Sequence, residues 1–320
     1  MKEYGGYFSL ELYENEEYYI YDSNSVRRCN SARSAIVDAV RDGKYRRIWV
    51  PIYTCDSIKK TLQMSDIEYV EYNINEQFLP VDVSVASGEI ILWTNYFGVF
   101  QEKWIQDNVV RRYKNVIIDN TQSFFTVPQM DVYNVYSCKK FFGVADGAYL
   151  IHEGLAEQPF KEYFSMPSAE FLLSSLENGT NGAYQEFLCH EKRLETEIGG
   201  RMSELTRRIM ASIRYHEVME KRGRNYRYIQ NRLDEYNELH FTITDQIPMV
   251  YPLLVKNETL RNYLVANKVY ISQWWKWIIE YSGSNEFERY LSKYLIPLPI
   301  DQRYGVEDME EIVRIVKEGL

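Results

Sequence analysis

The stretch from Val116 to Leu150 reads VIIDNTQSFFTVPQMDVYNVYSCKKFFGVADGAYL. It contains two short apolar runs, residues 116–118 and 132–137, and polar turns bound both runs. Such runs predict buried strands. Asp119 follows the first strand, and the pair Lys139-Lys140 follows the second. Ligands of α/β proteins bind where strands end at the carboxyl edge of the sheet, so we expect this acid and this amine to meet at one edge.

A carboxylate and an amine at one sheet edge form the pair that pyridoxal 5'-phosphate requires. The lysine forms a Schiff base with the cofactor, and the carboxylate keeps the pyridine nitrogen protonated so that the ring accepts electrons. Each residue alone has a simpler explanation. A strand-end aspartate is usually a turn or helix-cap residue, and two lysines after a strand are usually exposed. Only the combination of Asp119 and Lys140 predicts the cofactor.

The sequence before this stretch alternates between strand and helix patterns. We expect strands at residues 47–50, 67–72 and 89–96, and helices at residues 31–42, 56–63 and 106–113. Strands that alternate with helices predict an α/β fold with a mostly parallel sheet flanked by helices on both faces.

The pattern changes after Leu150. Residues 155–200 read as loop-rich, because ENGTNG at 177–182 is rich in turn residues, and a long polar helix is expected at 203–236. In the tail we expect strands at 249–255 and 269–272, an extended segment at 295–299, and helices at 259–267 and 306–317. We therefore predict a large cofactor-binding domain of residues 1–210 and a smaller C-terminal α+β domain of residues 211–320. Residues 1–28 are polar and rich in tyrosine, and we expect them to pack against the large domain as an arm.

The composition limits the classes of partner. The chain has 320 residues, 45% of them hydrophobic, and a net charge of −9, which argues against nucleic acid because phosphate-backbone binding needs a basic surface. No apolar run approaches the ~18–20 residues that span a bilayer, so no membrane partner is expected. The four cysteines show no CxxC spacing, the four histidines show no metal-ligand spacing, and the start does not resemble a signal peptide. We expect a cytoplasmic protein without a metal site.

Several short segments follow one another along the chain in an order that is hard to obtain by chance. They are Asn30–Ile36, Val50–Thr54, Asn95–Gly98, Asp119–Gln122, Ser137–Lys140, Asp146–Ala148 and Leu295–Val316. This series resembles the DegT–DnrJ–StrS group of pyridoxal-phosphate aminotransferases, with its SGTxAL, VPxxT, HLYG, DxAQ and SxxK motifs. The resemblance implies the fold of aspartate aminotransferase (type I), with active sites at the interface of a homodimer.

The resemblance also assigns roles to single residues. Lys140, three residues after Ser137, takes the position of the Schiff-base lysine, and Gln122 reaches the ring hydroxyl. The backbone amides of Ala32 and Arg33 hold the phosphate together with the hydroxyl of Ser137. These amides open a predicted helix, where free N–H groups and the helix dipole favour an anion. Arg33 replaces the family's threonine, and its guanidinium either binds the phosphate or points to solvent.

Other positions depart from the family pattern. Cys55 stands where the family commonly has an aromatic residue over the cofactor ring, so stacking must come from elsewhere, with Tyr53 or Tyr96 as candidates. Gly199 stands where the family has an asparagine that reaches the phosphate in the partner subunit. The segment Trp274–Trp277 either borders the substrate entrance or packs the small domain.

The leading hypothesis is a transaminase that moves an amino group from glutamate or glutamine to a small keto acceptor. Keto sugars of surface-polysaccharide synthesis, which are often linked to nucleotides, are the leading acceptor class. A second hypothesis is a pyridoxal-phosphate-dependent eliminase or dehydratase. Dehydratases of the group carry histidine at the lysine position, so Lys140 argues against that route. A third hypothesis is a non-catalytic ligand-binding or regulatory protein with the same fold, suggested by Cys55 and Gly199.

Overall fold

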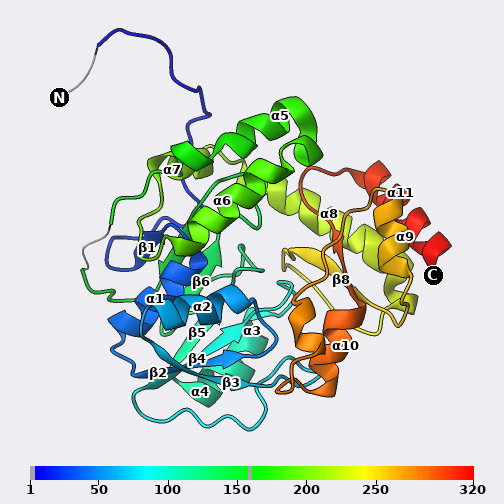
Figure 1. Cartoon of the computed structure of the whole chain (residues 1–320), viewed down its shortest axis with the longest axis horizontal. Coiled ribbons are helices and arrows are strands. Elements are labelled where there is room, and N and C mark those ends of the chain that lie inside the picture. The colour runs from blue at the N-terminus through cyan, green and yellow to red at the C-terminus, as the bar shows by residue number, and fades with distance from the viewer. Residues whose placement is uncertain (1–3, 158–160) are drawn as a thin grey trace.

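The computed structural model describes residues 4–157 and 161–320, and its main body is a seven-stranded sheet (Figure 1). The strands are β1 (Val26–Cys29), β2 (Arg47–Pro51), β3 (Glu68–Tyr72), β4 (Glu89–Thr94), β5 (Val116–Asp119), β6 (Tyr133–Ser137) and β7 (Ala148–Ile151). Their order across the sheet is β1-β7-β6-β5-β4-β2-β3. Strands β2 to β6 pair in parallel, whereas β7 is antiparallel to both of its neighbours. The mostly parallel sheet and its predicted strands are confirmed.

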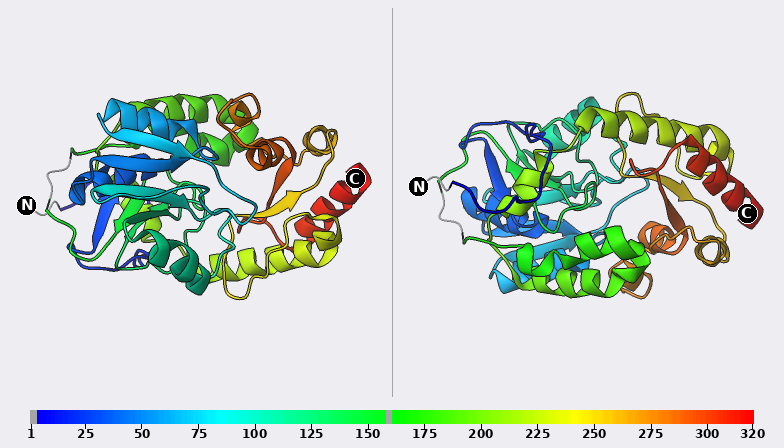
Figure 2. Two further views of the ribbon diagram at one scale, coloured as in Figure 1. Left: turned by 90° about the horizontal axis from the view of Figure 1, so that it is seen from below. Right: turned by 90° about the horizontal axis from the view of Figure 1, so that it is seen from above.

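Alternating side chains of the central strands supply two hydrophobic cores, one on each face of the sheet. In β4, Ile90 and Leu92 face a core that includes residues of α1 (Ala32–Asp42) and α2 (Asp56–Met64). Ile91 and Trp93 face the opposite core. That core is covered by α8 (Tyr215–Leu233) and by a helical segment made of α3 (Glu102–Ile105), a π-helical stretch (Gln106–Val110) and α4 (Arg111–Tyr113). Figure 2 shows the sheet between these two helical layers.

The loop-rich prediction for residues 155–200 is wrong for residues 166–196, and its residues 158–160 lie outside the described residues. This region forms a helical hairpin of α5 (Glu170–Gly182) and α6 (Tyr184–Thr196) after a single 3-10 turn at Met166–Ser168. The turn signals do act locally, because Gly179 has a φ of 74° and interrupts α5. One interruption of this kind kinks the hairpin without unfolding it.

The long helix predicted at 203–236 is divided in two. Helix α7 (Glu204–Met210) is capped by Ser203, whose hydroxyl accepts from the amide of Thr206, and α8 starts only at Tyr215. The buried Asp146 accepts from both the amide and the hydroxyl of Ser203, at 2.7 and 2.6 Å. This anchor fixes where α7 begins.

The C-terminal region builds a second, two-stranded antiparallel sheet. Its elements are β8 (Val250–Leu254), α9 (Leu260–Ala266), α10 (Glu286–Tyr294), β9 (Leu295–Pro299) and α11 (Val306–Gly319). The predicted strand at 269–272 is not formed, and α10 was not predicted. One hydrophobic cluster joins Trp93 of the large sheet to Leu253 and Leu298 of the small one, so the domain boundary near residue 210 stays a prediction.

The N-terminal arm packs against the body only in its second half. Tyr7 and Phe8 are 96% and 94% exposed, and this part of the arm projects from the body in Figure 1. Tyr19 is buried and donates its hydroxyl to the carbonyl of Phe124. The end of the predicted arm is strand β1, which pairs with β7 at the sheet edge; residues 1–3 lie outside the described residues.

Candidate active site

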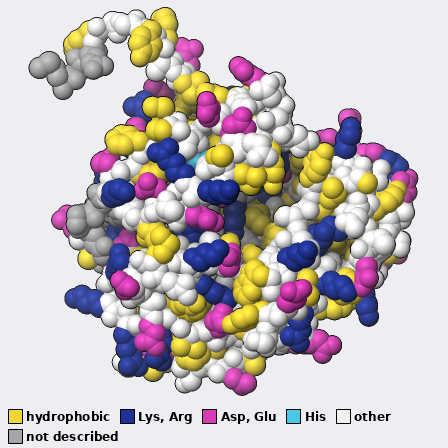
Figure 3. All heavy atoms as spheres, in the orientation of Figure 1, with side chains coloured by type: hydrophobic (Ala, Val, Ile, Leu, Met, Phe, Trp, Pro, Cys, Tyr) yellow, Lys and Arg dark blue, Asp and Glu magenta, His cyan; other side chains and the backbone are white. Residues whose placement is uncertain are grey.

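A cavity of about 320 Å³ opens beyond the carboxyl ends of β4, β5 and β6. The first residues of α1 and α2 form one wall, α6 forms another, and Trp275 reaches it from the C-terminal region. The face in Figure 3 is hollowed near its centre, where these elements converge in the same orientation in Figure 1. The cavity therefore lies where ligands of parallel α/β sheets bind.

One end of the cavity, which we call the acid–amine end, consists of Thr94, Asp119, Thr121 and Lys140. Asp119 ends β5 and is only 3% exposed. Its Oδ1 accepts from the amide of Thr121 at 3.0 Å, and its Oδ2 accepts from the hydroxyl of Thr94 at 3.5 Å. Two donors thus orient a buried carboxylate toward the cavity.

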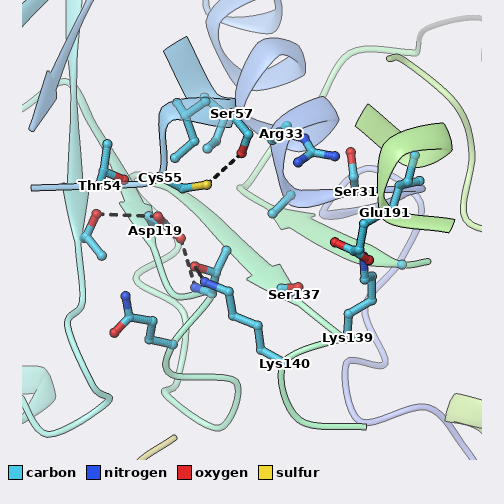
Figure 4. Close-up of a pocket in the computed structure, with 18 of the residues that line it drawn as sticks. Ser31, Arg33, Thr54, Cys55, Ser57, Asp119, Ser137, Lys139, Lys140 and Glu191 are labelled. Atoms are coloured by element: carbon cyan, nitrogen blue, oxygen red, sulfur yellow. Dashed lines mark hydrogen bonds and ion pairs between the residues drawn. The ribbon is translucent and has the colours of Figure 1, made fainter. Parts of the chain in front are cut away.

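Lys140 reaches the same end from the loop after β6. Its Nζ donates to Oγ1 of Thr121 at 3.1 Å, and Figure 4 shows the lysine and Asp119 directed toward this one region. Thr121 therefore contacts both groups, through its amide and through its hydroxyl. The structure brings Asp119 and Lys140 together, although Lys140 is exposed rather than buried.

Gln122 also lines the cavity and has a fixed orientation. Its Oε1 accepts from the backbone amide of Phe97 at 2.8 Å. Because a backbone N–H can only donate, this contact identifies the oxygen and leaves the side-chain NH2 group as the free donor.

The other end of the cavity, which we call the cationic end, consists of Ser31, Arg33, Lys139 and Glu191. Ser31 caps α1, and its hydroxyl accepts from the amide of Ser34. The two earlier amides, of Ala32 and Arg33, have no acceptor among the described residues. Ser137 lines the cavity between its two ends (Figure 4). The predicted phosphate residues Ala32, Arg33 and Ser137 thus all line the same cavity.

Lys139 and Lys140 diverge although they are adjacent in sequence. Lys139 forms an ion pair with Glu191 of α6 (Figure 4). Burial lowers the pKa of the Lys139 ammonium, Glu191 opposes this shift, and the nearby charge of Arg33 adds to it. One lysine therefore serves each end of the cavity.

The expected aromatic partners of the ring are not at the cavity wall. Tyr53 and Tyr96 are fully buried behind it, and the ring of Tyr53 packs edge-on against Trp275 at 4.5 Å. Cys55 does line the cavity, with its Sγ 2.9 Å from the hydroxyl of Ser57. Trp275 and Phe187 of α6 are the aromatic side chains that the described residues supply to the wall. Stacking by Tyr53 stays a prediction, and in this structure its ring contacts Trp275 rather than lining the cavity.

Several cavity residues were missed by sequence reasoning. They are Ser31, Thr54, Ser57, Ile58, Thr94, Thr121, Phe187, Glu191 and Leu194. Those of α6 were missed because the region read as loop, yet Phe187, His190 and Leu194 recur at helical spacing and are a signal that was available. For the segment Trp274–Trp277, the sequence left open whether it borders the substrate entrance or packs the small domain. Both occur, since Trp275 borders the cavity and Trp274 stacks on Phe97. Gly199, with a φ of 73°, has no side chain to offer the site.

The described residues contain neither a metal-binding cluster nor a membrane-spanning helix. No group of three or more His, Cys, Asp or Glu side chains among them is placed to hold a metal ion. None of the helices in the described part of the chain combines the length and apolar character that a bilayer crossing needs.

Comparison with solved structures gives extensive matches. The sugar aminotransferase CalS13 from Micromonospora echinospora matches with a TM-score of 0.63 at 11% identity, over 92% of this chain and 87% of that chain. A DegT DnrJ EryC1 StrS aminotransferase from Brucella abortus matches with a TM-score of 0.58 at 15% identity, over 92% and 85% of the two chains. The E. coli GDP-4-keto-6-deoxy-D-mannose-3-dehydratase with bound hydrated PLP matches with a TM-score of 0.60 at 12% identity, over 91% and 87%.

At these identities the likeness shows the fold. The chain has the fold of these enzymes, as the resemblance to the DegT–DnrJ–StrS group predicts. No family model matches the sequence, and no curated protein matches it.

Proposed function

We propose that this protein is a pyridoxal-phosphate-dependent aminotransferase that transfers the amino group of glutamate or glutamine to a keto acceptor. The observation that carries the proposal is the acid–amine end, where a buried carboxylate and a lysine amine both contact Thr121 in one cavity. The fold comparison supports the same class, since the matched structures include sugar aminotransferases.

The residues of the cavity fit the cofactor at each of its polar groups. Lys140 offers the amine for its aldehyde, Asp119 the carboxylate for its ring nitrogen, and Gln122 an amide donor for its ring hydroxyl. At the cationic end, the free amides of Ala32 and Arg33 open an eleven-residue helix and suit its phosphate. Trp275 replaces the expected tyrosines as the aromatic wall.

When bound, pyridoxal phosphate supplies an electron-accepting ring that stabilises negative charge on the carbon that gives up the amino group. Asp119 holds a proton on the ring nitrogen by a charge-assisted hydrogen bond, with its own oxygens fixed by Thr94 and Thr121. The Nζ of Lys140 would take the proton from the donor carbon and deliver it to the cofactor carbon that carried the aldehyde, and the hydroxyl of Thr121 positions this amine. Lys140 at this position favours transfer over the dehydratase chemistry of the third matched structure.

The acceptor class, assembly and location are further parts of the proposal. We propose a keto sugar as acceptor, because two of the matched structures are enzymes of sugar substrates by their names. We propose a homodimer because Lys140 is exposed in the single chain and because large apolar side chains such as Leu176, 83% exposed, stand on α5. We also propose a cytoplasmic setting, which the four unpaired cysteines support.

The test is a visible absorbance spectrum of the purified protein with added pyridoxal phosphate, before and after candidate amino donors are supplied. We expect a band from the lysine-bound cofactor that bleaches with glutamate or glutamine and returns with an acceptor. A protein that acquires no band, or a band that no donor bleaches, would contradict the assignment.

A further inference from the structure

The cationic end of the cavity concentrates positive charge and hydrogen-bond donors. Arg33, Lys139 and the free amides at the start of α1 converge there. Lys139 has a side chain only 19% exposed, and burial lowers the pKa of its ammonium. A partly buried ammonium beside a second cation and a helix N-terminus is a site for an anion of more than one charge.

Glu191 is the acidic side chain that this chain itself supplies to the cationic end. It comes from α6 and pairs with Lys139 (Figure 4). The second acidic residue of the cavity wall, Asp119, belongs to the opposite end. A phosphate monoester carries nearly two negative charges, and a carboxylate in contact with the same lysine would repel it. Glu191 and a phosphate therefore compete for Lys139.

The contacts of Glu191 allow this exchange without unfolding. Its side chain is 35% exposed, so it can turn into solvent while its backbone stays helical. The hairpin that carries it is also lightly anchored: α5 buries none of its residues, and α6 buries only His190 and Leu194.

We propose that Lys139 binds the phosphate of the cofactor and that Glu191 is a built-in competitor, which Lys139 exchanges for that phosphate. This inference rests on the proposed function for the identity of the ligand. Its consequence is selectivity: a dianionic phosphate displaces Glu191 from Lys139, whereas unphosphorylated pyridoxal leaves the ion pair in place. The Lys139–Glu191 ion pair therefore links α6 to the loop after β6 only while no phosphorylated ligand is bound.

The experiment compares the affinities of pyridoxal 5'-phosphate and pyridoxal in purified K139Q and E191Q variants, by equilibrium dialysis. Loss of the charged contact in K139Q should weaken binding of the phosphorylated form about tenfold or more and leave pyridoxal unchanged. Removal of the competitor in E191Q should tighten binding of the phosphorylated form about threefold, again without effect on pyridoxal. In the K139Q background, E191Q should add nothing.

Matched controls are available on the same helix. K192Q and E195Q make the same charge changes at exposed residues of α6 that do not line the cavity, and both should bind like the unaltered protein. Equal shifts in the controls, or equal shifts for both ligands, would overturn the inference. Circular dichroism confirms that each variant is folded.

An arm with inorganic phosphate separates this inference from the proposed function. Phosphate titrated by calorimetry should bind more weakly to K139Q and more tightly to E191Q, whether or not the protein is a transaminase. If pyridoxal phosphate fails to bind while phosphate follows this pattern, the proposed function fails and the Lys139–Glu191 exchange stands. If the cofactor binds and neither variant alters the binding of either phosphate ligand, the exchange fails and the proposed function stands.

Discussion

The two ends of the cavity are built differently. The acid–amine end stands on the carboxyl ends of β4 and β5, with a buried Asp119 fixed by two threonines. The cationic end depends on the first turn of α1 and on an ion pair to the lightly anchored helix α6. The contrast shows that strand ends position Asp119, whereas the ion pair of Lys139 depends on a helix with few buried residues, which is where we propose that ligands are distinguished.

The largest effect is expected at the acid–amine end, from Lys140→Ala. We expect turnover to fall by at least about a thousandfold, because among the described residues no other amine contacts Thr121 to move the proton. The measurement is amino transfer from glutamate under saturating cofactor. Binding of the cofactor's phosphate should persist, since Lys139 and α1 are untouched. Retention of full transfer would remove Lys140 from the mechanism.

Asp119→Asn tests the acid with almost no change in shape. An amide oxygen can accept from a protonated ring nitrogen but carries no negative charge to hold the proton there, so we expect turnover to fall about a hundredfold while the protein still folds. Steady-state kinetics measure this loss. Asp131→Asn, at an exposed position in the loop before β6, is the matched control and should leave the rate unchanged.

Thr121 allows a finer test, since it contacts both groups by different atoms. Thr121→Ala keeps the amide that donates to Asp119 but removes the hydroxyl that accepts from Lys140. We expect about a tenfold loss in kcat with a shifted pH profile, and Thr121→Ser should restore both. If alanine and serine behave alike, the hydroxyl does not position Lys140.

As pH falls, α6 at the cationic end should lose local stability before β5 at the acid–amine end does. His190 anchors α6 through Ser168 and the carbonyl of Ala145, and burial lowers its pKa below 6.5, with Lys139 acting in the same direction and Glu191 and Asp146 opposing. A histidine that is harder to protonate in the fold contributes stability above its unfolded pKa, and this stability is lost as pH falls through the lower folded value. The protection factors of the α6 amides, which correct for the slower intrinsic exchange at lower pH, should therefore fall from about pH 7.5 to about pH 5.5, while those of β5 stay high.

The His190→Gln variant is the control for that experiment. Its α6 amides should have low protection factors at both pH values, because the amide side chain cannot change its charge. An equal pH dependence in this variant would assign the effect to another group.

The sequence was informative about the acid–amine end and about the start of α1, and misleading about α6 at the cationic end, for physical reasons. Asp119 and Lys140 follow apolar runs whose strand character is local, so their meeting at one edge could be predicted. The hairpin that carries Glu191 was hidden by Asn178-Gly179 and Asn181-Gly182, which usually mark turns but here only kink and end α5. Trp275, with a left-handed backbone (φ 49°), is placed by tertiary contacts such as the Ser292 hydroxyl, which donates to its carbonyl at 2.8 Å.

The most direct measurement is the site at which the cofactor attaches. The protein is incubated with pyridoxal phosphate, reduced with borohydride and digested, and the modified peptide is fragmented to distinguish residue 139 from residue 140. We expect the pyridoxyl group on Lys140, beside Asp119 and Thr121. Attachment to Lys139, or scattered labelling of surface lysines, would contradict the assignment of the two ends.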